Sequence, residues 1–132
     1  MKLRALILGL GLALAAAPAF AHHSTTTFDR EKTVTMDGTV KQFKWANPHA
    51  WIEVVVPKGS AEPETWNVEM TAPNNLIQDG WKRTTLKPGD KVSIAVNPLK
   101  DGKTGGLFVG VKLADGTILG RAPTAAPAKP GK

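Results

Sequence analysis

Short runs in which apolar and polar residues alternate recur along this chain, and this period of two is typical of half-buried β-strands. The first run spans residues 34–45 and contains Asp37-Gly38, which we interpret as a turn signal. The apolar face changes within the run. The early apolar residues, Val34, Met36 and Val40, share one face, whereas the later ones, Phe43 and Trp45, share the opposite face. A bulge or bend inside a long strand would explain this change.

Later runs predict strands over residues 51–56, 65–70, 91–96 and 107–113, and a short final strand over 117–119. Each of the four longer runs has one apolar face that we expect to point inward. These faces are Ile52, Val54 and Val56; Trp66, Val68 and Met70; Val92, Ile94 and Val96; and Leu107, Val109, Val111 and Leu113.

One helix is predicted, over residues 73–81. Pro73 suits a first helical turn and Gly80 ends the pattern, with Leu76 and Ile77 expected to face inward. The element order favours an all-β protein with one short helix, built as a small five- to six-stranded Greek-key barrel of the OB-fold kind. An antiparallel β-sandwich is the alternative, and the helix between the third and fourth strands favours the barrel.

The two ends of the chain differ from this middle part. Residues 1–21 have a charged start, an apolar run and the small-residue pattern Ala19-Phe20-Ala21, which together predict a signal peptide cleaved after Ala21. The apolar run is too short for a transmembrane helix, so we expect export to the periplasm without membrane insertion. The domains expected are therefore a signal peptide at 1–21, a β-barrel at 22–120 and a disordered Pro/Ala/Lys tail at 121–132.

Charge and composition narrow the class of function. The 132 residues carry a formal charge of +6, but residues 28–120 contain 12 Lys and Arg against 11 Asp and Glu. Because the predicted barrel has so little basic excess, we expect no nucleic-acid partner. The chain has no cysteine, which excludes thiol catalysis and cysteine-ligated metals. No nucleophile–base pair or catalytic motif is recognisable, so a binding protein is favoured over an enzyme and no catalytic residue is assigned.

All three histidines lie at two places, His22 and His23 at the expected new amino terminus and His49 in a predicted loop. A free N-terminal histidine offers its α-amine and its Nδ1 to one metal ion, and a distant imidazole would add a third nitrogen. Such nitrogen ligands bind Cu(II) most tightly among the late divalent metals. The sequence therefore predicts a copper site made by His22 and His49, with His23 as a substitute for His22. Copper is the only cofactor expected.

Oxygen-bearing side chains and the methionines are weaker candidates for metal ligands than the histidines. Asp29 and Glu53 are candidate oxygen ligands that the sequence does not place, and Glu53 with Glu69 forms a weak pair of carboxylates on separate strands. Met36 and Met70 could bind Cu(I), but their inward positions favour core packing.

A second constellation surrounds an Asn-Pro turn and consists of Trp45, Asn47 and Trp51. The two tryptophans could present a stacking surface to a sugar, a base or a peptide, or cap the open end of the barrel. The alternative function is thus a metal-free module that binds a small ligand, a glycan or an envelope protein through Trp45 and Trp51. Trp66 is expected in the core and Trp81 at the end of the helix.

Several motifs resemble a family of small exported proteobacterial proteins of uncharacterised function. They are A-H-H-S at 21–24, D-x-x-K-x-V-x-x-x-G-x-V at 29–40, W-x-N-P-H-x-W at 45–51, and the stretches 80–83, 86–90 and 97–102. The resemblance covers almost all of the chain after the signal peptide, except the tail. It implies a periplasmic β-domain whose motifs are the His-His start and the N-P-H turn.

Overall fold

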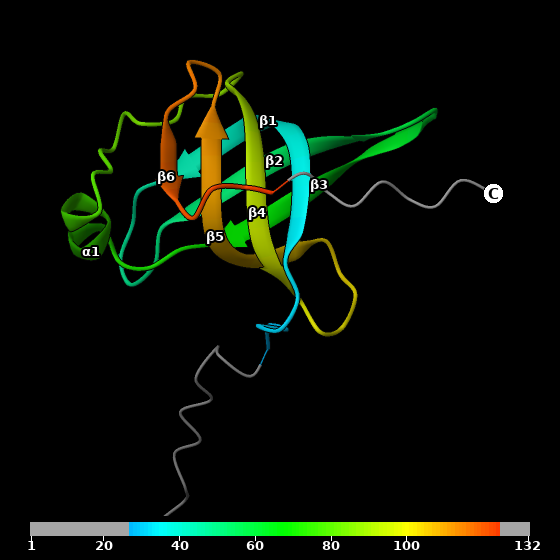
Figure 1. Cartoon of the computed structure of the whole chain (residues 1–132), viewed down its shortest axis with the longest axis horizontal. Helices are drawn as coiled ribbons and strands as arrows, with labels where there is room; N and C mark the ends of the chain where they lie inside the picture. Colours follow the sequence, from blue (N-terminus) through cyan, green and yellow to red (C-terminus); the bar gives the residue numbers. More distant parts are fainter. Residues whose placement is uncertain (1–26, 125–132) are drawn as a thin grey trace, which may run out of the picture.

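Five strands close into a small barrel, a short sixth strand pairs with the last of them, and one short helix lies beside the barrel (Figure 1). The structure is a computed structural model that describes residues 27–124. The elements, in chain order, are β1 (Val34–Lys44), β2 (Trp51–Lys58), β3 (Ala61–Glu69), α1 (Pro73–Gln78), β4 (Lys91–Pro98), β5 (Gly105–Leu113) and β6 (Ile118–Gly120).

The strand order defines an OB-fold-like Greek-key barrel. Strands β1, β2 and β3 form an antiparallel meander, β4 pairs with the other edge of β1, and β5 pairs with β4. The end of β3 then runs parallel to the start of β5, from Asn67 opposite Gly105 to Glu69 opposite Leu107, and this pairing closes the ring. A closed ring confirms the predicted barrel and excludes the alternative of two packed sheets.

Strand β1 takes part in both halves of the barrel because it is long and bulged. Its register with β2 shifts between Val40 and Gln42, which confirms the predicted change of apolar face. The turn expected at Asp37-Gly38 was wrong, since both residues pair with β4 inside the continuous strand. A Cβ on Gly38 would lie 2.5 Å from Val54 Cγ1 and 2.7 Å from the Val55 carbonyl oxygen. The glycine therefore allows β2 to approach closely.

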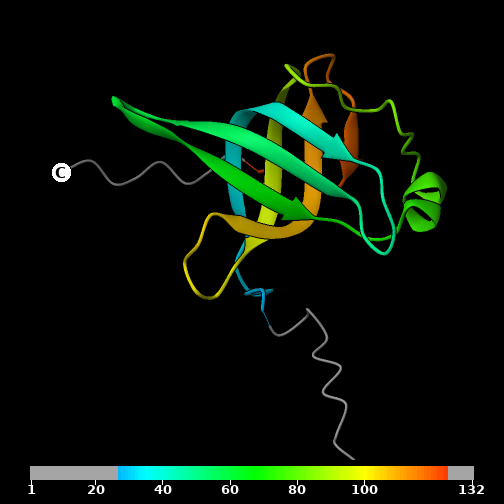
Figure 2. The ribbon, with the colours of Figure 1, turned by 180° about the vertical axis from the view of Figure 1, so that it is seen from behind.

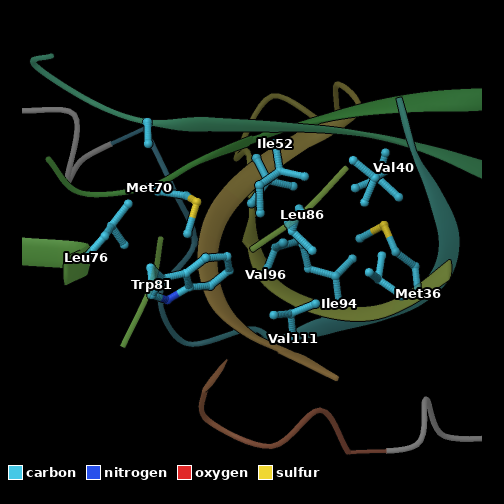
Figure 3. Packing of buried hydrophobic residues seen from close by; sticks show 14 residues of the cluster. Met36, Val40, Ile52, Met70, Leu76, Trp81, Leu86, Ile94, Val96 and Val111 are labelled. Atoms are coloured by element: carbon cyan, nitrogen blue, oxygen red, sulfur yellow. The ribbon is translucent and has the colours of Figure 1, made fainter. Parts of the chain in front are cut away.

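The core fills the barrel with the inward faces of the strands (Figure 3). Ile52, Val54, Val68, Ile94 and Val96 are fully buried, as the alternating patterns predicted. Met36 and Met70 are also buried, which confirms their packing role. Trp66 is half-buried against the same cluster. Burial of these apolar side chains supplies most of the free energy that favours folding.

Two predicted details of the apolar pattern were wrong. The helix ends at Gln78 rather than at residue 81, and Ile77 is 57 % exposed while Leu76 is buried. So short a helix has only one narrow stripe that faces the core. After the helix, Gly80, with φ of +89°, turns the chain so that Trp81 enters the core.

In β5, Phe108 packs against the core, whereas Leu107 and Val109 lie outside the core cluster. The pairing of β4 with β5 shifts between Ala95 and Val96, which face Gly110 and Phe108 and leave Val109 as the extra residue. This bulge reverses the predicted alternation in the first half of the strand, whereas Val111 and Leu113 face the core as predicted.

The barrel has two distinct ends. Figure 2 shows the β2–β3 hairpin extending beyond the barrel, and the β4–β5 loop near the start of the described chain, away from α1. The predicted signal peptide and most of the predicted tail lie outside the described residues. Among residues 27–124, no helix is long and apolar enough to cross a membrane.

Candidate binding groove

The loop between β1 and β2 carries His49, and its end is anchored by the buried residue Ala50. The Ala50 N–H donates to the Thr71 carbonyl oxygen (3.1 Å), and its carbonyl accepts from the Met70 N–H (2.9 Å). Because Ala50 faces the core, the neighbouring side chains of His49 and Trp51 turn to the outer side of the barrel. The Asn47–Pro48 peptide bond in this loop is cis.

His49 contacts Glu69, a partner that sequence reasoning did not identify. The His49 Nδ1 lies 2.6 Å from the Glu69 Oε1, and the two side chains are 40 % and 10 % exposed. When Nδ1–H donates to the carboxylate, Nε2 keeps its lone pair and can bind a metal or accept a hydrogen bond. In the sequence, Glu69 was considered only as part of a weak carboxylate pair with Glu53. Its contact with His49 depends on how β3 lies beside the loop, which the sequence does not show.

A groove of about 700 Å³ runs along the outer face of β2 and β3, beside this histidine–carboxylate pair. Trp51, Asn67 and Glu69 line one side, and the β4–β5 loop forms another with Lys103 and Thr104. Gly105 and Gly106 also line it, as do Thr27 and Phe28 at the start of the described chain. This face and the loops at its ends are where OB-fold proteins bind their ligands.

The residues predicted around the Asn-Pro turn do not form one shared surface. Trp45 is half-buried against the core, with its ring edge-on to Phe43 at 5.7 Å between centroids. Trp51 is 36 % exposed and lines the groove, whereas Asn47 is exposed in the loop. Trp45 therefore packs against the core cluster, and Trp51 alone of the two lines the groove.

The two candidate oxygen ligands are engaged elsewhere. The Asp29 carboxylate lies 3.1 Å from the Lys32 ammonium, and Glu53 lies 3.1 Å from Lys44 and 3.4 Å from Lys41. Hydrogen bonds from these lysines lower the pKa of both carboxyl groups. They are therefore poorly placed to bind a metal together with His49.

His22 and His23 lie outside the described residues. Within residues 27–124 no three His, Cys, Asp or Glu side chains gather as a potential metal site. Of the residues predicted to form the copper site, His49 is therefore the one that lies in the described part of the chain. Its ring is oriented by Glu69.

These features define the class of protein: a small OB-fold-like β-barrel with a groove on its β2–β3 face. The sequence matches the profile of a family of unknown function (DUF6152) over residues 10–109, and the chain belongs to that family. No curated protein matches the sequence.

Among solved structures, the chain is similar to the crystal structure of the mitochondrial single-stranded DNA-binding protein Rim1 from S. cerevisiae. The two share 8 % identity, with a TM-score of 0.48, over 63 % of this chain and 93 % of that chain. The strand order and pairing described above, rather than this similarity, define the fold.

Proposed function

We propose that this protein is exported to the periplasm and binds Cu(II) through the processed N-terminal His22 and the loop residue His49. The observation that carries this proposal is the contact between His49 Nδ1 and Glu69 Oε1. A carboxylate in this position holds the orientation of the imidazole ring, as it does for histidines that bind metals in many proteins. Copper would gain two further nitrogens from the α-amine and the ring of His22.

The chain path supports the meeting of these groups. Thr27 lines the same groove as Glu69 and lies five positions after His22 in the sequence. An extended segment of that length spans at most about 17 Å, which brings the α-amine within range of the groove that His49 adjoins. His23 can replace His22, because a histidine in second position can chelate through its ring, the intervening amide and the amine.

The test is the Cu(II) affinity of processed protein beginning at His22, measured by competition with a chelator of known affinity. The extension Gly-Ser-Gly-Ser before His22, which keeps both histidines out of the first three positions, or the substitution His49→Ala, should each weaken binding strongly. Glu69→Gln should weaken binding about 10- to 100-fold, because it removes the charge that orients the ring. Glu53→Gln is the matched control, since Glu53 pairs with lysines instead. The proposal fails if affinity is unchanged in both the extended protein and His49→Ala.

The variant His23→Ala separates the two chelates. If His22 binds through its own amine and ring, His23→Ala should retain tight binding and the Cu(II) electron paramagnetic resonance spectrum of the parent. Loss of binding in His23→Ala, with retention in His22→Ala, would place the ring ligand at the second position.

The second candidate is a metal-free module that binds a ligand on the β2–β3 face. The exposure of Trp51 in the groove favours this function. Trp45 packs against the core, so it does not contribute to the two-tryptophan stacking surface that the sequence predicted. For this function, Trp51 fluorescence should respond to a ligand after copper has been removed by chelation.

A further inference from the structure

One aromatic side chain that lines the groove lies outside the core cluster. Trp81 is buried, Trp45 packs on Phe43, and the Trp66 Nε1 donates to Glu64 Oε2 at 3.3 Å. Trp51, at the start of β2, is instead one-third exposed and lines the groove. The exposed part of an indole in a groove offers a ligand an apolar surface on which to stack.

Polar groups that can exchange hydrogen bonds with a ligand surround this ring. Glu69 pairs with Trp51 in the β2–β3 register, and Asn67 lies two residues before it on the same outer face. The Asn67 side chain is exposed and has no hydrogen bond to another described residue, while one Glu69 oxygen accepts from His49. A ring platform flanked by an amide and a carboxylate offers both donors and acceptors to a polar ligand.

Glycines leave room in the groove beside these groups. At Gly105, a Cβ would lie 2.8 Å from Leu99 Cδ1 and 3.1 Å from the Asn67 carbonyl oxygen. At Gly106, it would lie 2.7 Å from the Asn97 carbonyl oxygen. Gly105 therefore allows β5 to approach β3 closely, and Gly106 allows it to approach β4, and the backbone at these positions lines the groove without side chains.

The charges around the groove argue against a polyanion. Among the described residues that line it, Glu69 is acidic and Lys103 is the one base, and the Lys103 ammonium lies 3.9 Å from the Asp101 carboxylate. The phosphates of a nucleic acid would therefore meet a carboxylate with little basic charge to compensate it. A neutral ligand rich in hydroxyl groups meets no such repulsion, and its apolar ring faces can stack on Trp51.

We propose that the groove binds a neutral oligosaccharide, with Trp51 stacking on a sugar ring and Asn67 and Glu69 hydrogen-bonding its hydroxyl groups. The volume of about 700 Å³ is within the range of small-ligand sites. This proposal does not rest on copper binding, because the groups that it uses all lie within the described barrel.

The test is a titration of the chelator-treated protein with three neutral hexasaccharides, cellohexaose, maltohexaose and chitohexaose, and with a deoxythymidine oligonucleotide. Binding is followed by tryptophan fluorescence and calorimetry, so that it is measured separately from copper. At least one hexasaccharide should bind saturably, and Trp51→Ala should weaken it roughly tenfold or more. Trp51→Phe should retain part of the affinity, and Asn67→Ala should weaken it less than Trp51→Ala does.

Ile118→Ala is the matched control, because Ile118 is exposed on β6 and does not line the groove. Its affinity should equal that of the parent, and circular dichroism should show that every variant is folded. Absence of binding to all three hexasaccharides would overturn the proposal. So would binding that Trp51→Ala leaves unchanged, or tighter binding of the oligonucleotide than of any hexasaccharide.

Discussion

At the scale of single residues, partners decide what each charged side chain can do. Glu53 and Glu69 both project from the outer face of the barrel, at neighbouring positions of the β2–β3 ladder. Glu53 lies between two lysine ammonium groups, whereas Glu69 contacts an imidazole and lines a groove. The same chemical group is thus a surface ion-pair partner in one strand and part of a candidate site in the next.

The ion pairs of Glu53 predict how stability changes in acid. Hydrogen bonds from Lys44, and then from Lys41, lower the pKa of Glu53 below its ordinary value of 4.5. This group therefore stabilises the folded state above pH 4.5, and the contribution disappears as the pH falls through the lowered pKa. Glu53→Gln should flatten the fall of Tm in this acid range, as measured by thermal unfolding from neutral to acidic pH.

Glu62→Gln on the exposed β2–β3 hairpin is the control for this measurement. It should leave the acid dependence of Tm close to that of the parent. An unchanged pH profile in Glu53→Gln would show that the two lysines do not stabilise the fold through Glu53. High salt should reduce the difference between Glu53→Gln and the parent, because these groups are exposed to solvent.

At the scale of elements, local irregularities let ordinary strands form a closed barrel. The bulge near Val40 moves the apolar face of β1 from one side to the other, and the shift between Ala95 and Val96 does the same in the β4–β5 pair. Both allow strands to bend while they keep apolar side chains in the core. Gly38 complements the bulge, since it brings the backbones of β1 and β2 close together.

The close approach at Gly38 makes a specific prediction about stability. Gly38→Ala would place a Cβ against the Val55 carbonyl oxygen, which is backbone and cannot move aside easily. We expect a loss of about 1–3 kcal/mol in the free energy of unfolding, measured by urea denaturation. Gln42→Ala, at an exposed site of the same strand, should change it by about 0.5 kcal/mol or less. Equal effects of the two substitutions would refute the packing argument.

At the scale of the whole molecule, the short parallel pairing of β3 with β5 closes the barrel and also shapes the groove. Three residue pairs make this contact, and the Asn67 N–H adds a hydrogen bond to the Thr104 carbonyl at 3.3 Å. Residues from both strands line the groove. Closure of the barrel and the shape of the groove therefore depend on the same contact.

The substitution Gly105→Ala tests this dependence. Its Cβ would lie 3.1 Å from the Asn67 carbonyl oxygen of β3 and 2.8 Å from Leu99 Cδ1, and should weaken the closure by about 1–3 kcal/mol. Hydrogen exchange should become faster at the Asn67 amide, which bonds across this closure, than at amides of the β1–β2 ladder. Thr104→Ala is the control, since it keeps the backbone carbonyl that accepts from Asn67. Uniform loss of protection over all strands would instead indicate global destabilisation.

The alternating pattern was sufficient to predict the strands, because inward positions of a strand must be apolar whatever the strand pairs with. The order of the elements, with a helix between the third and fourth strands, favoured the barrel over the sandwich. The alternating pattern located the five principal strands and placed Ile52, Val68 and Ile94 in the core. It failed at Ile77 and in β5, where a short helix and a bulge change which side chains face inward. Those changes depend on neighbouring elements and leave no local periodic signal.

For the site, the sequence by itself singled out His49 and Trp51 from their residue types and their place beside the N-P-H turn. Only the tertiary structure decided their surroundings. It turned Trp45 inward and Trp51 outward, and it placed Glu69 beside His49 although twenty residues separate them. The physical reason is that a side chain's type is fixed by the sequence, whereas its partners and its exposure are set by strand register and by closure of the barrel.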